Sequence, residues 1–329
     1  MHARKLGTQG LEVSAVGLGT MGMAGVAGMG DMYGPVDEAE AIATIHRALD
    51  IGVNFFDTAE VYGPYTNERL LGRGLKGRRD RAIVATKFGF RIEGDKMVGV
   101  DGRPGNVRRA IDGSLERLGV DYIDLWYQHR LDRSVPIEDT VGAMAEAVQA
   151  GKVRFLGLSE CSVANLRRAA AVHPITALQT EYSLWWREVE AEILPTAREL
   201  GIGFVAYSPL GRGLLSGTVP ARDELAANDF RRMTPRYADE NLEANLKGVE
   251  ALREAASARG VTSAQLALAW VMARGDDVVP IPGTKRRRWI EENAAACDVA
   301  LTPEEADALA AAVPEAVGDR YPDMSHIDR

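Results

Sequence analysis

Short apolar runs alternate with longer amphipathic segments along most of the chain. After an expected hairpin at residues 4–6 and 11–14, the apolar runs are three to seven residues long and suit buried strands. We predict strands at residues 15–18, 54–56, 81–86, 122–128, 153–159, 177–180, 203–208 and 278–281. Between them, apolar residues recur at helical spacing. We predict helices at residues 37–49, 67–75, 104–118, 137–150, 163–172, 189–200, 242–273, 286–296 and 303–312.

Several of the helix starts carry recognisable signals. Asp37 gives an acidic start, Asn67 suits an N-cap, and Pro104 suits a first helical position. About eight strands alternating with helices in 329 residues favour a closed parallel (β/α)8 TIM barrel over an open sheet. The class is therefore α/β, with an N-terminal β-hairpin and extra C-terminal helices.

No linker divides the chain, so residues 1–329 are expected to form one barrel domain. The tail at residues 314–329 is expected to be mobile in part. Residues 209–238 are too long for an ordinary connection, and we interpret them as a functional lid.

The composition argues against some classes of binding partner and indicates a cellular compartment. The formal net charge of −8 argues against nucleic acid or an acidic membrane surface as the main partner. Two cysteines, Cys161 and Cys297, are too few for a disulfide framework and favour a reducing cytoplasm. No apolar run is long enough to span a membrane, and no metal-ligand spacing is present. Self-association cannot be deduced from the sequence.

Four polar side chains stand at or just past the ends of three predicted strands. Asp57 ends one strand and Tyr62 lies in the loop beyond it, Lys87 ends the next, and His129 ends the third. The carboxyl ends of parallel strands meet on one face of a barrel, so these side chains should converge. A phenol beside an ammonium and an imidazole is a proton donor tuned for use near neutral pH.

Residues 17–22, with the sequence GLGTMG, match a dinucleotide-binding pattern that needs a helix at the third glycine. The glycine-rich residues that follow do not suit a helix start, so we favour a flexible loop at the mouth of a strand.

The order of motifs resembles that of the aldo-keto reductases over nearly the whole chain. The segments that carry the resemblance are GLGTMG at 17–22, FDTAEVYG at 56–63, ATKFG at 85–89, QH at 128–129, GLS at 157–159, YSPLGRG at 207–213, IPGTK at 281–285 and EN at 292–293. The likeness is greatest to the bacterial branch related to potassium-channel β subunits. It implies a barrel that reduces aldehydes or ketones with NADPH, an enzyme of the alcohol dehydrogenase class.

The resemblance assigns the catalytic residues Asp57, Tyr62, Lys87 and His129. Tyr62 would donate the proton, Lys87 would favour the phenolate, Asp57 would fix Lys87, and His129 would orient the carbonyl. It also implies a cofactor site made of Gly19, Thr20, Met21, Asp57, Ser159, Gln179, Tyr207, Ser208, Pro209, Leu210, Gly211, Gly213, Leu215, Gly283, Thr284, Lys285, Arg288, Glu292 and Asn293.

Two positions depart from the family pattern. Glu160 stands where the family more often has Asn, and Trp289 stands where much of the family has Arg. The phosphate contacts are therefore expected from Lys285 and its neighbours at the start of the next helix. Two other functions remain open: a nucleotide-binding regulatory module like the channel β subunits, and an NAD-dependent sugar or polyol dehydrogenase.

Overall fold

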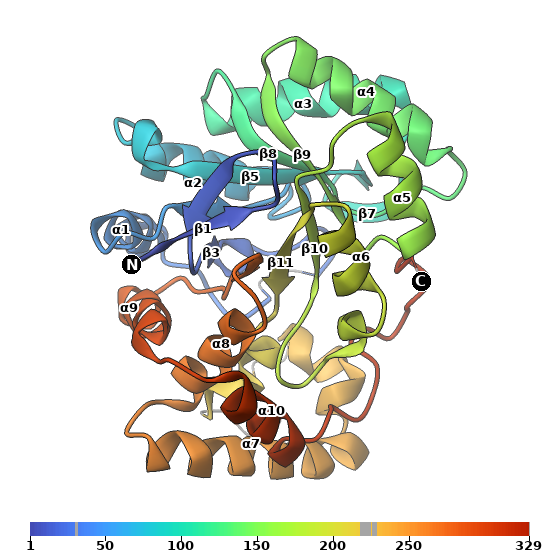
Figure 1. Ribbon diagram of the computed structural model, residues 1–329. Coiled ribbons are helices and arrows are strands. Elements are labelled where there is room, and N and C mark those ends of the chain that lie inside the picture. The colour runs from blue at the N-terminus through green and yellow to red at the C-terminus, as the bar shows by residue number, and fades with distance from the viewer. Residues whose placement is uncertain (30–31, 218–224, 226–228, 329) are drawn as a thin grey trace.

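The protein is a parallel barrel surrounded by helices (Figure 1), described here from a computed structural model that covers residues 1–29, 32–217, 225 and 229–328. Eight parallel strands follow one another around a single sheet. They are β3 (Leu18–Gly19), β4 (Phe55–Asp57), β5 (Ile83–Phe88), β8 (Ile123–Gln128), β9 (Val153–Ser159), β10 (Ala177–Glu181), β11 (Gly203–Tyr207) and β12 (Val278–Pro280). The (β/α)8 class and seven of the predicted strands are confirmed. The first was placed too early, because residues 15–17 lie outside the strand, which consists of Leu18–Gly19.

Hydrogen bonds join the two edges of this sheet. The amide of Gly17 donates to the carbonyl of Pro280 at 2.9 Å, and that of Gly19 donates to Pro282 at 3.2 Å. Gly19 and Gly283 also form a parallel bridge. The first and last strands are thus neighbours, and the carboxyl ends of all eight strands face the same side.

Helices of the described chain cover the outside of the sheet and extend below it (Figure 1). Their bounds are α1 (Glu38–Asp50), α2 (Thr66–Leu75), α3 (Pro104–Leu118), α4 (Ile137–Gln149), α5 (Val163–Val172), α6 (Ile193–Glu199), α7 (Asp239–Ala258), α8 (Ser263–Ala273), α9 (Arg287–Ala295) and α10 (Pro303–Ala312). The Asp37 side chain caps α1 by accepting from the amides of Ala39 and Glu40. Most predicted bounds agree within two residues, because the buried apolar faces follow the helical period.

Two local predictions were wrong. Asn67 is not an N-cap, because α2 begins at Thr66 and the buried Asn67 side chain accepts from the hydroxyls of Thr20 and Thr58 at 2.6 Å each. Residues 90–100, which were given no secondary structure, form a hairpin of β6 (Phe90–Glu93) and β7 (Lys96–Val100). Its signal was an apolar-polar alternation around a Gly-Asp turn.

The predicted N-terminal hairpin is present and closes one end of the barrel. It consists of β1 (Ala3–Leu6) and β2 (Leu11–Ser14). Leu6, Leu11 and Val13 are buried in one cluster with barrel residues such as Phe55 and Tyr127. The interior is filled at this end, so the open mouth lies at the carboxyl ends of the strands.

Two segments lie over that mouth. Of the expected lid, residues 218–224 and 226–228 fall outside the described part, and the remainder includes 3-10 helices at Gly211–Ser216, Phe230–Met233 and Pro235–Tyr237. The C-terminal tail is held at Ile327, whose carbonyl accepts from Arg133 at 3.0 Å. It is also held at Asp328, which accepts from the side chains of Ser162 and Asn165. Mobility of the tail stays a prediction.

None of the helices in the described part of the chain has the length and apolar character that crossing a bilayer requires.

Candidate active site

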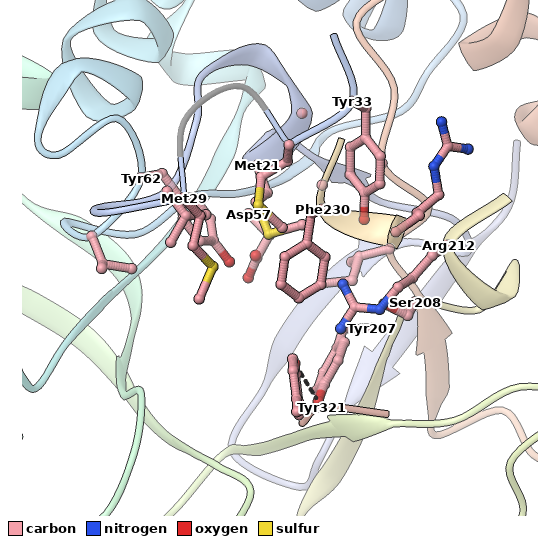
Figure 2. Close-up of a pocket in the computed structure, with 18 of the residues that line it drawn as sticks. Met21, Met29, Tyr33, Asp57, Tyr62, Tyr207, Ser208, Arg212, Phe230 and Tyr321 are labelled. Atoms are coloured by element: carbon pink, nitrogen blue, oxygen red, sulfur yellow. Dashed lines mark hydrogen bonds between the residues drawn. The ribbon is translucent and has the colours of Figure 1, made fainter. Parts of the chain in front are cut away.

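A cavity of about 690 Å³ opens at the carboxyl ends of the strands. Figure 2 shows Asp57, Tyr62 and Met29 on one side of it, and Tyr207, Arg212 and Tyr321 on the other. Its walls come from strand ends, from the loop that follows β3, from the β6–β7 hairpin, from the lid and from the tail. The expected convergence of strand-end side chains is therefore seen at this mouth.

Lys87 and Asp57 form a buried ion pair beneath the cavity. Lys87 lies inside β5 and is fully buried, and its Nζ donates to Asp57 Oδ1 and, at 2.9 Å, to the carbonyl of Thr58. The second carboxylate oxygen of Asp57 accepts from Gln179 Nε2 at 2.8 Å. Both oxygens are thus fixed, and Asp57 holds the ammonium in one place.

Tyr62 and His129 line the cavity directly above this pair. The Lys87 Nζ lies 5.2 Å from the centroid of the Tyr62 ring, and the ring centroids of Tyr62 and His129 are 6.0 Å apart in an edge-on arrangement. The imidazole also packs against the Phe90 ring in a T-shaped arrangement, at 4.9 Å between centroids. All four predicted catalytic side chains are therefore brought together.

The protonation states follow from burial. Burial raises the pKa of Tyr62 well above its ordinary value, the charge of Asp57 adds to this, and Arg130 opposes it. Burial, with Arg130 and Lys87, lowers the pKa of His129 well below its ordinary value. At Tyr62 desolvation outweighs the opposing charge of Arg130. The tuning of this phenol as a proton donor for use near neutral pH stays a prediction. At pH 7 the site holds a protonated phenol and a neutral imidazole.

The predicted cofactor residues divide into two groups. Those that line the cavity are Gly19, Met21, Asp57, Ser159, Gln179, Tyr207, Ser208, Pro209, Leu210, Gly213, Gly283, Thr284 and Lys285. Those that do not line it are Thr20, Gly211, Leu215, Arg288, Glu292 and Asn293. Thr20, for example, is fully buried, and its hydroxyl donates to the carbonyl of Asp57 at 2.8 Å. Arg288 instead stacks on the ring of Trp289 at 3.7 Å.

The far end of the cavity, at the start of α9, is basic. Lys285 Nζ donates to the carbonyls of Tyr33, Gly34 and Pro35 at 2.7–3.0 Å. The amide of Arg287 at the start of α9 donates to the Glu40 carboxylate at 3.0 Å. The N-terminus of α9, which was expected to bind a phosphate, is thus partly occupied by the protein's own carboxylate. Arg286 lines the cavity in place of Arg288.

Sequence reasoning missed several lining residues. Arg130 follows His129, Arg212 lies within the YSPLGRG motif, and Tyr321 comes from the tail. The Arg212 guanidinium lies between the rings of Phe230 and Tyr321, at 4.8 and 5.0 Å. The motif itself was the available signal for Arg212. No local pattern points to Tyr321, because its position depends on the path of the tail.

Comparison with known proteins agrees with this geometry. A profile of the Aldo/keto reductase family matches residues 15–314. The chain belongs to this family of oxidoreductases.

Solved structures of the family resemble the whole chain. The glycerol dehydrogenase AKR11B4 from Gluconobacter oxydans is 31% identical, with a TM-score of 0.85 over 98% of this chain and 99% of its own. The aldo-keto reductase AKR11C1 from Bacillus halodurans, in a holo form, is 29% identical, with a TM-score of 0.79 over 98% and 100%. An aldo/keto reductase from Klebsiella pneumoniae in complex with NADP and acetate is 26% identical, with a TM-score of 0.73 over 98% and 100%. The closer likeness to channel β subunits is not confirmed.

Proposed function

We propose that this aldo-keto reductase reduces aldehydes or ketones to alcohols with NADPH, and that Tyr62 is the proton donor. The observation that carries the proposal is the phenol of Tyr62 at the cavity wall, next to a neutral His129 and above the buried Lys87–Asp57 pair. A donor that stays protonated at pH 7 suits the reductive direction.

Each of the four catalytic residues has a separate role at the carbonyl group of the substrate. Bound NADPH supplies the hydride. Tyr62 donates its proton to the oxygen on which negative charge develops, and Lys87 stabilises the phenolate that remains. Asp57 and Gln179 keep the ammonium in place. His129, being neutral, offers a hydrogen bond that orients the carbonyl without competing for the proton.

The cavity suits a dinucleotide phosphate. Tyr207 offers a flat ring for the nicotinamide, and Arg212 with the loop at residues 208–213 offers donors for the pyrophosphate. Lys285 and Arg286 provide positive charge for the 2′-phosphate, and Trp289 offers a face for the adenine. The positive charge of Lys285 and Arg286 supports NADPH over NADH, because only NADPH carries the 2′-phosphate.

The test is turnover of purified protein with NADPH and a panel of aromatic aldehydes and ketones, followed at the NADPH absorbance. The proposal predicts aldehyde-dependent oxidation of NADPH, with NADH less effective. Tight NADPH binding without turnover on the whole panel would instead favour a nucleotide-binding regulatory module.

A polyol dehydrogenase is the second candidate, because the Gluconobacter relative is named a glycerol dehydrogenase. The walls near Tyr62 are a poor match for a polyol, since they include Val26, Met29, Val61 and Met97. Apolar walls leave hydroxyl groups without partners. Faster oxidation of glycerol with NAD than reduction of any aldehyde would select this candidate.

A further inference from the structure

Arg130 is a cation buried in the wall of the active-site cavity. It follows His129 at the end of β8, and only 7% of its surface is exposed. Its Nη1 donates to the carbonyl of His129 at 2.6 Å and to the hydroxyl of Ser159 at 3.2 Å. These two bonds use one nitrogen and fix the direction of the guanidinium. In the described chain, Nε and Nη2 donate to no protein acceptor.

This cation has no ion-pair partner among the described residues. Their carboxylates all lie more than 4.0 Å from its nitrogens. The neighbouring Glu160 accepts from Arg320 at 2.6 Å, and Asp57 is paired with Lys87. Burial acts to lower the pKa of Arg130, but nearby tyrosines and Glu160 act on it through space and raise it overall, and no carboxylate of the described residues bonds it directly. A buried charge without a direct partner favours an anion that can reach it.

The proposed cofactor does not supply that anion. Its phosphates belong at the loop with Arg212 and at the end with Lys285 and Arg286, whereas Arg130 lies beside His129 and Ser159, at the catalytic end. The nicotinamide that would lie at this end carries no phosphate. The remaining source of negative charge is the substrate.

Apolar side chains also line this end of the cavity. Met29, Met97 and Val61 line the cavity near Tyr62, and Phe90 packs against His129. Methionine side chains adapt to apolar bodies of different shape. A ligand that suits this end has an apolar body and one carboxylate.

We propose that Arg130 binds a carboxylate carried by the carbonyl substrate, so that the enzyme prefers apolar aldehydes or ketones bearing an acid group. The inference rests on the proposed reductase function and deepens it. A guanidinium offers a carboxylate two parallel hydrogen bonds, which fix the orientation of the substrate as well as its charge. The carboxylate lies at Arg130, and the reacting carbonyl remains at Tyr62 and His129.

The kinetic test uses the 2-, 3- and 4-carboxybenzaldehydes and their methyl esters with NADPH. In the parent, at least one acid is expected to exceed its ester in kcat/KM by about tenfold or more, the loss typical of a charge-assisted contact. Arg130→Met should bring this ratio to about one. The ratio is the readout, because Arg130 also acts on the pKa of Tyr62 and of His129 and its loss can change the rate for acids and esters alike. Arg130→Lys should retain part of the preference for the acid over the ester, since it keeps the positive charge but lacks the two parallel N–H donors of the guanidinium.

The matched control is Arg109→Met on the exposed face of α3, which should leave every ratio unchanged. Esters as good as the acids in the parent would overturn the proposal. If Arg130→Met lowered kcat/KM equally for acids and esters and also weakened NADPH binding, Arg130 would belong to the cofactor site, and the proposal would again be overturned.

A binding measurement separates this inference from the reductase function. Benzoate and benzamide are titrated into the parent, Arg130→Met and Arg130→Lys, and tryptophan fluorescence is followed. We expect Arg130→Met to weaken benzoate binding by about tenfold or more and to leave benzamide unchanged. The same binding result is expected even if the protein reduces no aldehyde. A lack of reduction would count against the proposed reductase function and would leave the role of Arg130 intact. Benzoate binding that is equal in the parent and both variants would overturn the role of Arg130.

Discussion

Glu160 at the end of β9 accepts a hydrogen bond of 2.6 Å from Arg320 in the C-terminal tail, and both side chains are almost fully buried. A second pair lies beside it, because Glu181 at the end of β10 accepts from Arg236 at 2.5 Å. The lid and the tail are thereby tied to two adjacent strand ends. The next tail residue, Tyr321, enters the cavity, where its hydroxyl lies 3.4 Å from that of Tyr207.

Arg320→Met should destabilise the protein by about 3 kcal/mol, because Glu160 stays buried with the amide of Glu181 but without its charged partner. It should also raise KM for carbonyl substrates, since Tyr321 loses its anchor. Denaturant unfolding and steady-state kinetics measure the two effects. The double variant Glu160→Met/Arg320→Met should recover much of the stability.

As a control, Arg167→Met removes an exposed pair with Glu199 and should cost less than about 1 kcal/mol. An equally small cost for Arg320→Met would show that the buried pair does not hold the tail.

The Glu160–Arg320 pair also shows where sequence reasoning ends. Glu160 was recognised as a departure from the family, but its partner is 160 residues away, and no periodic pattern connects the two. By contrast, α3 and β9 have the predicted bounds, because burial repeats at the helical or strand period within one segment. The strand-end residues Asp57 and His129 were predictable because barrel topology brings strand ends together. The use of Gln179 to hold Asp57, and of Glu40 to cap α9, depended on side-chain directions that the sequence does not specify.

Glu60 should make stability depend on pH. Burial raises its pKa from 4.5 to about 8, with the amide of Gly89 opposing and Glu68 adding to the shift. A carboxyl group with a raised pKa binds more protons when folded, so its stabilising effect is complete below pH 4.5 and is lost as pH rises through about 8. Glu60→Gln should therefore stabilise the protein more, relative to the parent, at pH 9 than at pH 6. Urea unfolding at both pH values measures this. If Glu60→Gln changed the free energy of unfolding equally at pH 6 and pH 9, Glu60 would not titrate in this range.

Lys87→Met should lower turnover strongly and cost about 3 kcal/mol of stability, because Asp57 keeps only Gln179 as a buried partner. The double variant Asp57→Asn/Lys87→Met should regain stability but not turnover, which separates the electrostatic role from a structural one. Lys152→Met, which removes an exposed pair with Asp112, is the control. Turnover that recovers together with stability would contradict the role given to the ammonium.

Arg286→Ala should weaken NADPH binding by about tenfold while NADH binding changes little, since only NADPH carries the 2′-phosphate. Lys285→Ala should weaken both cofactors, because its ammonium also holds the carbonyls of residues 33–35. Fluorescence titration of both cofactors into the parent and the two variants measures the six dissociation constants. Losses that are the same for NADH and NADPH in Arg286→Ala would remove this residue from the phosphate site, and a parent that prefers NADH would contradict the cofactor proposal.

The central claim is that Tyr62 gives its proton to the carbonyl oxygen, and Tyr62→Phe tests it most directly. The ring and its contacts with His129 and Lys87 remain, and only the hydroxyl is removed. The control is Tyr122→Phe, at a tyrosine that is 37% exposed outside the cavity. With saturating NADPH and an aromatic aldehyde, kcat of Tyr62→Phe should fall by about a hundredfold or more, while the NADPH dissociation constant and the Tyr122→Phe activity stay near those of the parent. A kcat for Tyr62→Phe within about threefold of the parent would contradict the claim, because loss of a proton donor costs far more than that.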